Sequence, residues 1–263
     1  FVERFAAPFY GGITLDRSLG TDSAVFEYTY KMLSEGEIFV PADGMGAMPA
    51  QLAERATGAG VTIETGRRVD AVEAADGGAV TVETASESID VEGCVVATDP
   101  ATAADLTGVD TIPTETLGCV TQYFSVPTSK APSMGKRIVL NAADDRPNTV
   151  APLSTVAPEY APEGMELYSA TFLGTPDADD EALADEVADA LASWYPAAGF
   201  DALALRRTDR VPLAQFAQPP GFRDSLPDPD APAGPVALAG DYTRWSSIQG
   251  ALESGRVAAE LLQ

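Results

Sequence analysis

The residues best suited to chemistry lie near the end of the chain, where a short apolar run meets an acidic turn. The run Val236 to Ala239 leads into Gly240 and Asp241, and a helix is predicted from about Ser247. Amides at a helix start, with the positive end of the helix dipole, suit an anionic ligand group. A carboxylate after a buried strand can accept hydrogen bonds from ligand hydroxyls, and α/β sheets bind ligands at this edge. This stretch is therefore a candidate cofactor site.

The same stretch also has a structural interpretation. Asp241 can cap a turn, and Gly250 and Gly255 can allow close packing of the helix. Because short motifs often occur by chance, local physics alone favours this interpretation over a cofactor site.

Several other kinds of site are excluded by composition. The chain contains no histidine, which excludes Ser-His-Asp and Cys-His catalysis and every His-ligated metal site. Cys94 and Cys119 are too few for a cysteine-rich zinc site and give no sign of a disulfide scaffold. The acidic run 177–180 is typical of a solvated helix start. We therefore expect no metal site. A cytoplasmic location is a separate expectation.

Acidic side chains dominate the charge of the chain. There are 40 Asp and Glu against 16 Lys and Arg, which gives a formal net charge of −24. So few cations cannot easily form the basic face that nucleic acids require. The acidic residues are spread along the chain, and Arg is preferred to Lys. This pattern favours a halophilic protein that stays soluble in concentrated salt over an ordinary acidic cytoplasmic protein. No apolar run is long enough to span a membrane, and peripheral membrane contact is left open.

The periodicity of apolar residues predicts a mixed α/β chain. Helices are expected at 28–33, 46–57, 101–106, 179–195 and from 247 onward. Strands are expected at 37–40, 61–63, 69–72, 80–82, 89–91, 94–97, 117–126, 137–141, 165–173, 200–216 and 235–239. Gly11-Gly12 is predicted to form a turn, and Asp76-Gly77-Gly78 is a hairpin signal.

Four segments together resemble the flavin-dependent amine oxidase superfamily, which includes phytoene-desaturase-type and protoporphyrinogen-oxidase-type enzymes. The C-terminal signature of that family is a strand ending in Gly-Asp, then a helix with Gly-Ala, Ser-Gly and Ala-Ala pairs. It is matched here by Gly240-Asp241, Gly250-Ala251, Ser254-Gly255 and Ala258-Ala259. The segments 42–49, 60–72 and 94–100 resemble further family motifs in the expected order, although Asp43 replaces a glycine of the first.

The resemblance implies an α/β fold in two parts. One is part of an FAD-binding domain of glutathione-reductase type, expected at residues 1–100 and 217–263. The other is an antiparallel β-sheet substrate domain with helices, expected at 101–216. Alternatively, residues 1–39 belong to the substrate domain. The substrate sheet is expected to have six or seven strands, with helix 179–195 behind it.

The resemblance also assigns roles to the C-terminal residues. Asp241, which follows Gly240, would accept hydrogen bonds from the ribityl chain of FAD. The amides of Gln249, Gly250 and Ala251 would face the pyrimidine edge of the flavin, where the helix dipole stabilises charge on the reduced ring.

Earlier residues would complete the FAD site. Val69 would present its backbone to the adenine, and Gly44 and Met45 would lie near the flavin. The family fingerprint Gly-x-Gly-x-x-Gly is absent, because Pro49 replaces the third glycine of its closest imitation. The resemblance places the pyrophosphate cradle upstream of Phe1. We therefore expect the C-terminal portion of a longer flavoenzyme, which alone binds FAD weakly or not at all.

One position bears on the branch of the superfamily. Ser247 stands where amine oxidases usually place an aromatic residue of their substrate cage. This favours a desaturase-type oxidoreductase, in which a hydride moves from an apolar, isoprenoid- or carotenoid-like substrate to flavin N5 without a protein nucleophile. No catalytic residue is assigned. The alternatives are an amine or protoporphyrinogen oxidase, or a non-catalytic fragment that acts as a binding module.

Overall fold

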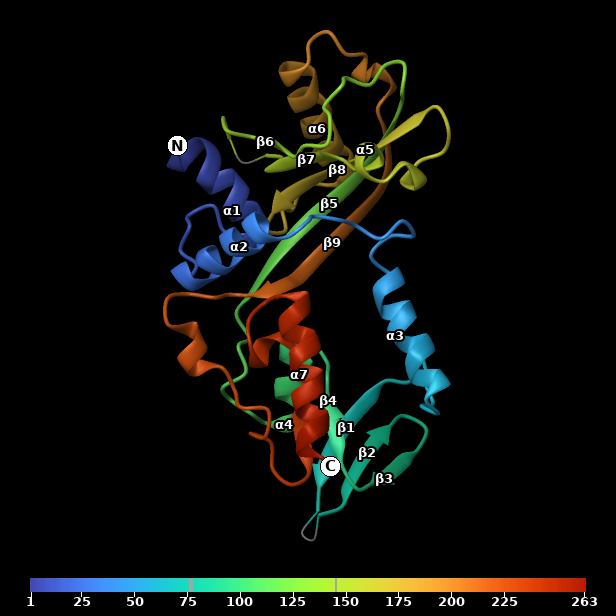
Figure 1. Cartoon of the computed structure of the whole chain (residues 1–263), viewed down its shortest axis with the longest axis vertical. Helices are drawn as coiled ribbons and strands as arrows, with labels where there is room; N and C mark the ends of the chain where they lie inside the picture. The colour runs from blue at the N-terminus through green and yellow to red at the C-terminus, as the bar shows by residue number, and fades with distance from the viewer. Residues whose placement is uncertain (76–77, 145) are drawn as a thin grey trace. The chain divides into compact units, whose positions relative to one another are not determined.

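The structure of the protein is a computed structural model, and it describes residues 1–75, 78–144 and 146–263. The chain forms two compact units, and each unit is built from two separate segments (Figure 1). Unit 1 contains Phe1–Val61 and Leu117–Ala214, and unit 2 contains Thr62–Thr116 and Gln215–Gln263.

Unit 1 is organised around a sheet with the strand order β6-β7-β8-β5-β9. The strands are β5 (Thr116–Pro127), β6 (Val139–Leu140), β7 (Thr149–Pro152), β8 (Met165–Leu173) and β9 (Ala204–Phe216). Strands β6, β7, β8 and β5 pair antiparallel, with Phe124 opposite Tyr168 at the centre. Five strands form this sheet in the described part of the chain, so the expected six or seven was wrong. β7 was missed because its short run lies among prolines.

One helix covers the buried face of this sheet. α6 (Asp180–Trp194) begins at Asp179, whose carboxylate accepts a hydrogen bond from the amide of Ala182. Its buried stripe Leu183, Val187 and Leu191 packs with inward-facing side chains of β5, β7 and β8. Alternation along β5 buries every second residue from Val120 to Val126, as expected when one sheet face is covered. The sequence predicted this helix and its stripe correctly.

The first segment of unit 1 is helical. A single π-helical turn η1 (Val2–Ala6) continues into α1 (Ala7–Thr14), and α2 (Ser23–Glu35) and α3 (Ala47–Gly58) follow. The turn predicted at Gly11-Gly12 is wrong, because α1 runs through both glycines. The strand predicted at 37–40 is also wrong: these residues form no strand, and Ile38 and Phe39 are 79% and 84% exposed.

Unit 2 contains two small sheets. β1 (Val69–Ala74), β2 (Val80–Thr84) and β3 (Ser88–Val91) pair antiparallel in that order. β4 (Cys94–Val96) and β10 (Val236–Leu238) form a parallel pair. The expected strand at 61–63 is wrong, because these residues pair with no other strand in the described part of the chain; Gly60 and Gly66, on either side of them, have positive φ. The β1–β2 hairpin forms as expected, although Asp76 and Gly77 of its signal lie outside the described residues.

The helices of unit 2 follow its two parallel strands. α4 (Pro100–Thr107) comes after β4, and α7 (Ile248–Leu261) comes after β10. The remaining short elements of the chain are α5 (Leu153–Val156) and the 3₁₀ turns η2 (Pro158–Tyr160), η3 (Phe200–Ala202), η4 (Phe222–Ser225) and η5 (Asp241–Thr243). Within the described residues, no helix combines the length and the apolar character needed to cross a membrane.

Candidate functional site

Two strand ends meet at one edge of unit 2. In the parallel pair, Val236 lies opposite Cys94 and Leu238 opposite Val96, and the amide of Ala239 donates to the carbonyl of Val96 at 2.9 Å. The carboxyl ends of both strands therefore lie side by side. Ligands of α/β sheets bind outside such strand ends, so the geometry required of a cofactor site is present here.

Each strand end carries an aspartate. Asp99 follows β4 and caps α4, since its carboxylate accepts hydrogen bonds from the amide and hydroxyl of Thr102 at 3.1 and 2.6 Å. Asp241 follows β10 and Gly240. Burial raises the pKa of the Asp241 carboxyl, and hydrogen bonds from the side chain of Ser246 and the amide of Tyr242 act in the opposite direction. Burial is the largest cause, so the net change in the pKa of Asp241 is upward.

The buried Tyr242 lies within the electrostatic influence of both acids. It is 1% exposed, and burial together with the charges of Asp241 and Asp99 raises its pKa to about 12. Its ring also explains the glycine before the aspartate: a Cβ on Gly240 would lie 2.1 Å from the ring of Tyr242. Gly240 thus has a packing function of its own, which the sequence did not predict.

The start of α7 is capped by its own chain. The hydroxyl of Ser247 accepts a hydrogen bond from the amide of Gly250 at 2.8 Å, and its carbonyl accepts one from Ala251 at 3.0 Å. Two of the three amides expected to face a flavin are therefore engaged. The amides of Ile248 and Gln249 have no acceptor within the helix, because a helix leaves its first amides unpaired. An anionic group at this helix start would meet these two amides.

Gly250 is also required by packing. A Cβ at this position would lie 2.4 Å from the carbonyl oxygen of Trp245. By contrast, a Cβ on Gly255 would meet nothing within 4 Å. Only the first of these two signature glycines is therefore required by the packing of this chain.

The remaining expected residues lie elsewhere. Val69 begins β1, opposite Thr84, and belongs to unit 2. Gly44, which has a φ of 83°, and the half-exposed Met45 precede α3 in unit 1. The structure thus brings Gly240, Asp241, Gln249, Gly250 and Ala251 together in one connection. Asp99 was not predicted to lie at this edge, although an Asp-Pro pair after a buried strand is a recognisable helix start.

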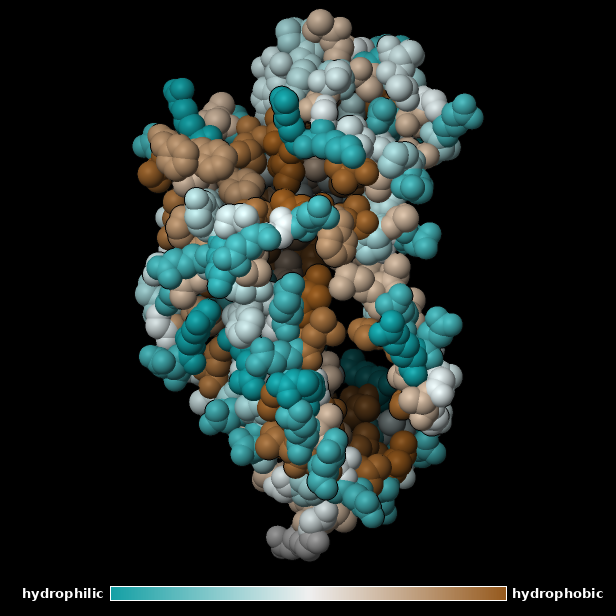
Figure 2. Space-filling model, in the orientation of Figure 1, coloured by the Kyte–Doolittle hydropathy of each residue, from teal (hydrophilic) through white to brown (hydrophobic). Residues whose placement is uncertain are grey.

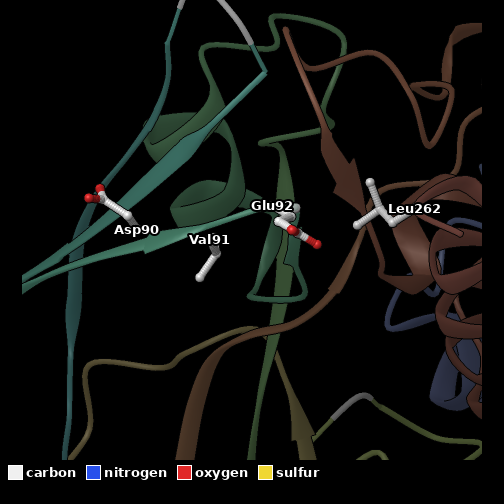
Figure 3. Close-up of a pocket in the computed structure, with 5 residues that line it drawn as sticks. Asp90, Val91, Glu92 and Leu262 are labelled. Carbon is white, nitrogen blue, oxygen red and sulfur yellow. The ribbon is translucent and has the colours of Figure 1, made fainter.

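A hollow at the opposite end of β4 is a poor candidate for a cofactor. It is lined by Asp90, Val91, Glu92, Gly93 and Leu262 (Figure 3). In the figure Glu92 extends toward Leu262, while Asp90 points away from it. Because Glu92 and Gly93 precede β4, this hollow lies at the amino end of the strand, and its acidic side chains disfavour an anionic ligand.

Comparison with known proteins gives the family. A family model described as flavin containing amine oxidoreductase matches residues 1–263. No curated protein sequence matches the chain.

Solved structures share the fold. An oxidoreductase from Methanosarcina mazei has a TM-score of 0.74 at 17% identity, covering 98% of this chain and 64% of that one. A candidate protoporphyrinogen oxidase from Exiguobacterium sp. 255-15 has a TM-score of 0.63 at 12% identity, covering 83% and 51%. A cyclohexylamine oxidase from Brevibacterium oxydans has a TM-score of 0.56 at 16% identity, covering 74% and 48%.

These similarities confirm the predicted fold class, a mixed α/β chain of the FAD-binding amine oxidase type with antiparallel sheet. The chain spans 64%, 51% and 48% of the three similar structures. Since the family model matches from the first residue to the last, the chain belongs to the family of flavin-containing amine oxidoreductases.

Proposed function

We propose that this chain is part of an FAD-dependent oxidoreductase and that the connection from β10 to α7 binds the flavin. The observation that carries this proposal is the position of Asp241, a partly buried carboxylate at the carboxyl end of a parallel strand, shortly before a helix start. The family supplies the cofactor class.

The residues of this connection fit FAD. Burial raises the pKa of Asp241, so hydroxyl donors from a ribityl chain would stabilise its charged form. The unpaired amides of Ile248 and Gln249, at the positive end of the α7 dipole, suit the polar pyrimidine edge. Gly250 and Ala251 would act through Ser247, which their amides hold in place at the helix start. Bound FAD would supply the hydride-accepting N5.

The proposed branch is a desaturase-type oxidoreductase with a small apolar, isoprenoid- or carotenoid-like substrate. Ser247 supports this choice, because its hydroxyl caps α7 and offers no aromatic wall for an amine. An amine or protoporphyrinogen oxidase is the second candidate, and similar folds with both names exist at 12–16% identity. A non-catalytic binding module is the third.

We also assign the FAD side to unit 2 and the substrate side to unit 1. The support for this assignment is that residues 1–61 cluster with residues 117–214, the segment that carries the antiparallel sheet. We therefore adopt the alternative in which residues 1–39 belong to the substrate domain. The roles of Val69, Gly44 and Met45 stay predictions.

The test uses the complete protein that contains this chain. FAD is titrated into apoprotein while flavin fluorescence is followed, for the parent, Asp241→Asn, and Asp230→Asn as a matched exposed control in unit 2. Loss of one charge-assisted hydrogen bond should weaken FAD binding roughly ten- to a hundredfold in Asp241→Asn. Equal affinity of all three proteins would contradict the site.

A second measurement separates the branches. Anaerobic reduction of bound flavin is followed by absorbance with an isoprenoid polyene, a primary amine and a porphyrinogen. Bleaching by the polyene alone supports the desaturase type, and bleaching by either of the others supports the second candidate. Flavin that stays oxidised with all three favours the binding module.

A further inference from the structure

A cavity lies between the first two helices of unit 1. Its volume is about 270 Å³. Its lining residues all lie between Val2 and Thr29 and include Ala6, Tyr10, Thr14, Leu19 and Phe26. Every one of these residues belongs to residues 2–29, so the cavity is formed within one unit and by none of the residues assigned to the flavin.

The walls of this cavity are largely apolar. Along η1 and α1 the lining residues are spaced four apart, at Val2, Ala6, Tyr10 and Thr14, and therefore share one helix face. The hydroxyl of Thr14 donates to the carbonyl of Tyr10 at 3.0 Å, which leaves its methyl group for the cavity. The carboxylate of Asp22 accepts from the amide of Ala24 at 2.8 Å. These two polar groups are thus engaged by their own helices.

Aromatic rings join the two helices beside the cavity. The rings of Tyr10 and Phe26 have centroids 4.7 Å apart, and each ring also lines the cavity. Apolar surface over the N-terminal helices is visible on the left of Figure 2. Flat apolar walls of this kind favour a ligand with rings or double bonds.

The linker between the helices is held in an unfavourable conformation. Leu15 and Leu19 have φ angles of 57° and 59°, in the left-handed region that branched side chains rarely adopt. Asp16 accepts hydrogen bonds from the amides of Ser18 and Gly20 at 2.8 and 2.9 Å. Strain of this kind persists only where surrounding contacts impose it, and it is often associated with ligand sites. Here it places Leu19 on the cavity wall.

We propose that this cavity binds a neutral, predominantly apolar small molecule with at least one ring or conjugated double bond. An apolar cavity of about 150 Å³ already binds benzene, so this one has room for a larger molecule. An anionic ligand is disfavoured by Asp22 in the wall and by the net charge of −24. None of the residues that form this site is assigned to the flavin.

The test is a fluorescence titration of the chain with N-phenyl-1-naphthylamine, a neutral aromatic probe. Ala6→Phe places a ring inside the cavity and should weaken probe binding at least about tenfold. Ala50→Phe adds the same ring at an exposed position of α3, outside the cavity, and should bind within about twofold of the parent. Ala6→Leu fills less space and gives an intermediate loss even if Ala6→Phe fails to fold.

The anionic analogue 1-anilinonaphthalene-8-sulfonate distinguishes this site from adhesion to exposed aromatic side chains. The proposed binding site in the cavity is supported if the parent and Ala50→Phe prefer the neutral probe and both Ala6 variants lose this preference. Unchanged binding in folded Ala6 variants, or equal loss in Ala50→Phe, overturns the proposal. Equal affinity for both probes in all variants also overturns it.

Discussion

Two glycines of α7 should respond differently to the same substitution. Gly→Ala inside a helix normally stabilises by about 0.5–1 kcal/mol, because alanine loses less conformational freedom on folding. At Gly255 the new methyl group meets nothing within 4 Å. Gly255→Ala should therefore show this full gain.

At Gly250 the same methyl group would lie 2.4 Å from the carbonyl oxygen of Trp245 and 3.2 Å from the hydroxyl of Ser247. Contacts below 3.0 Å are essentially never seen for a Cβ, so this backbone must move by more than half an ångström. Such overpacking costs about 1–3 kcal/mol. The gain from replacing glycine in a helix offsets part of this cost. Gly250→Ala should therefore leave the free energy of unfolding unchanged or lower it by up to about 2 kcal/mol, so this variant should be clearly less stable than Gly255→Ala.

Thermal and urea denaturation of the two variants and the parent, under identical conditions, measures this difference. For a chain of this size 1 kcal/mol corresponds to about 2–4 °C in Tm, so Gly255→Ala should melt visibly above Gly250→Ala. If Gly250→Ala raised the midpoint as much as Gly255→Ala, the close approach of Trp245 to the helix start would be wrong.

Three further predictions concern caps and charges. Ser247→Ala should cost about 1 kcal/mol in chemical denaturation, because it removes the cap of α7, whereas Ser247→Thr should retain most of it. Because the Asp241 pKa is raised above 3.8, its folded form holds its proton longer, so its contribution to stability is present below that pH and is lost as pH rises through the raised pKa. As the pH rises from 3.8 through the raised pKa, Asp241→Asn should therefore lose less stability than the parent, and an identical profile would contradict this cause. Added salt should raise the unfolding midpoint, because screening the net charge of −24 outweighs the loss of exposed ion pairs such as Arg210–Asp180; a falling midpoint would count against salt adaptation.

The sequence predicted those elements whose pattern is local and strong. β8 occupies 165–173 as expected, and α6 buries the three apolar residues that its spacing indicated. α7 begins directly after Ser247, the residue from which it was expected. In these cases binary patterning and capping agree with the tertiary packing, so local reasoning was sufficient.

Elements that depend on distant partners could not be predicted in this way. Gly11 and Gly12 read locally as a turn, yet a Cβ on Gly11 would lie 2.8 Å from the Cα of Arg17, and one on Gly12 would lie 2.9 Å from the side-chain amide of Asn148. The glycines are therefore helical residues that allow close approach. Arg17 in turn donates to the carbonyls of Asn141 and Asp144, a contact across more than a hundred residues.

The candidate site shows the same division. Gly240 and Asp241 were recognisable from the chain itself, because strand, turn and helix follow one another there. That Asp99 lies at the same edge depends on the parallel pairing of β4 with β10, which are far apart in sequence. The packing of Tyr242 against Gly240 depends on burial of its ring, which a motif does not reveal.

The interleaving of the two units has a consequence for biosynthesis. Residues 1–61 leave the ribosome before the strands of residues 117–214 that complete their unit, and residues 62–116 must wait for residues 215–263. Among the described residues, the strand partner of β4 is β10, which is made much later. Domains usually fold as units in the order of synthesis, but here both nascent units hold unsatisfied apolar surface while the chain grows. Synthesis of residues 215–263 is then the event that completes unit 2, and premature termination anywhere before β10 would leave the proposed flavin edge unformed.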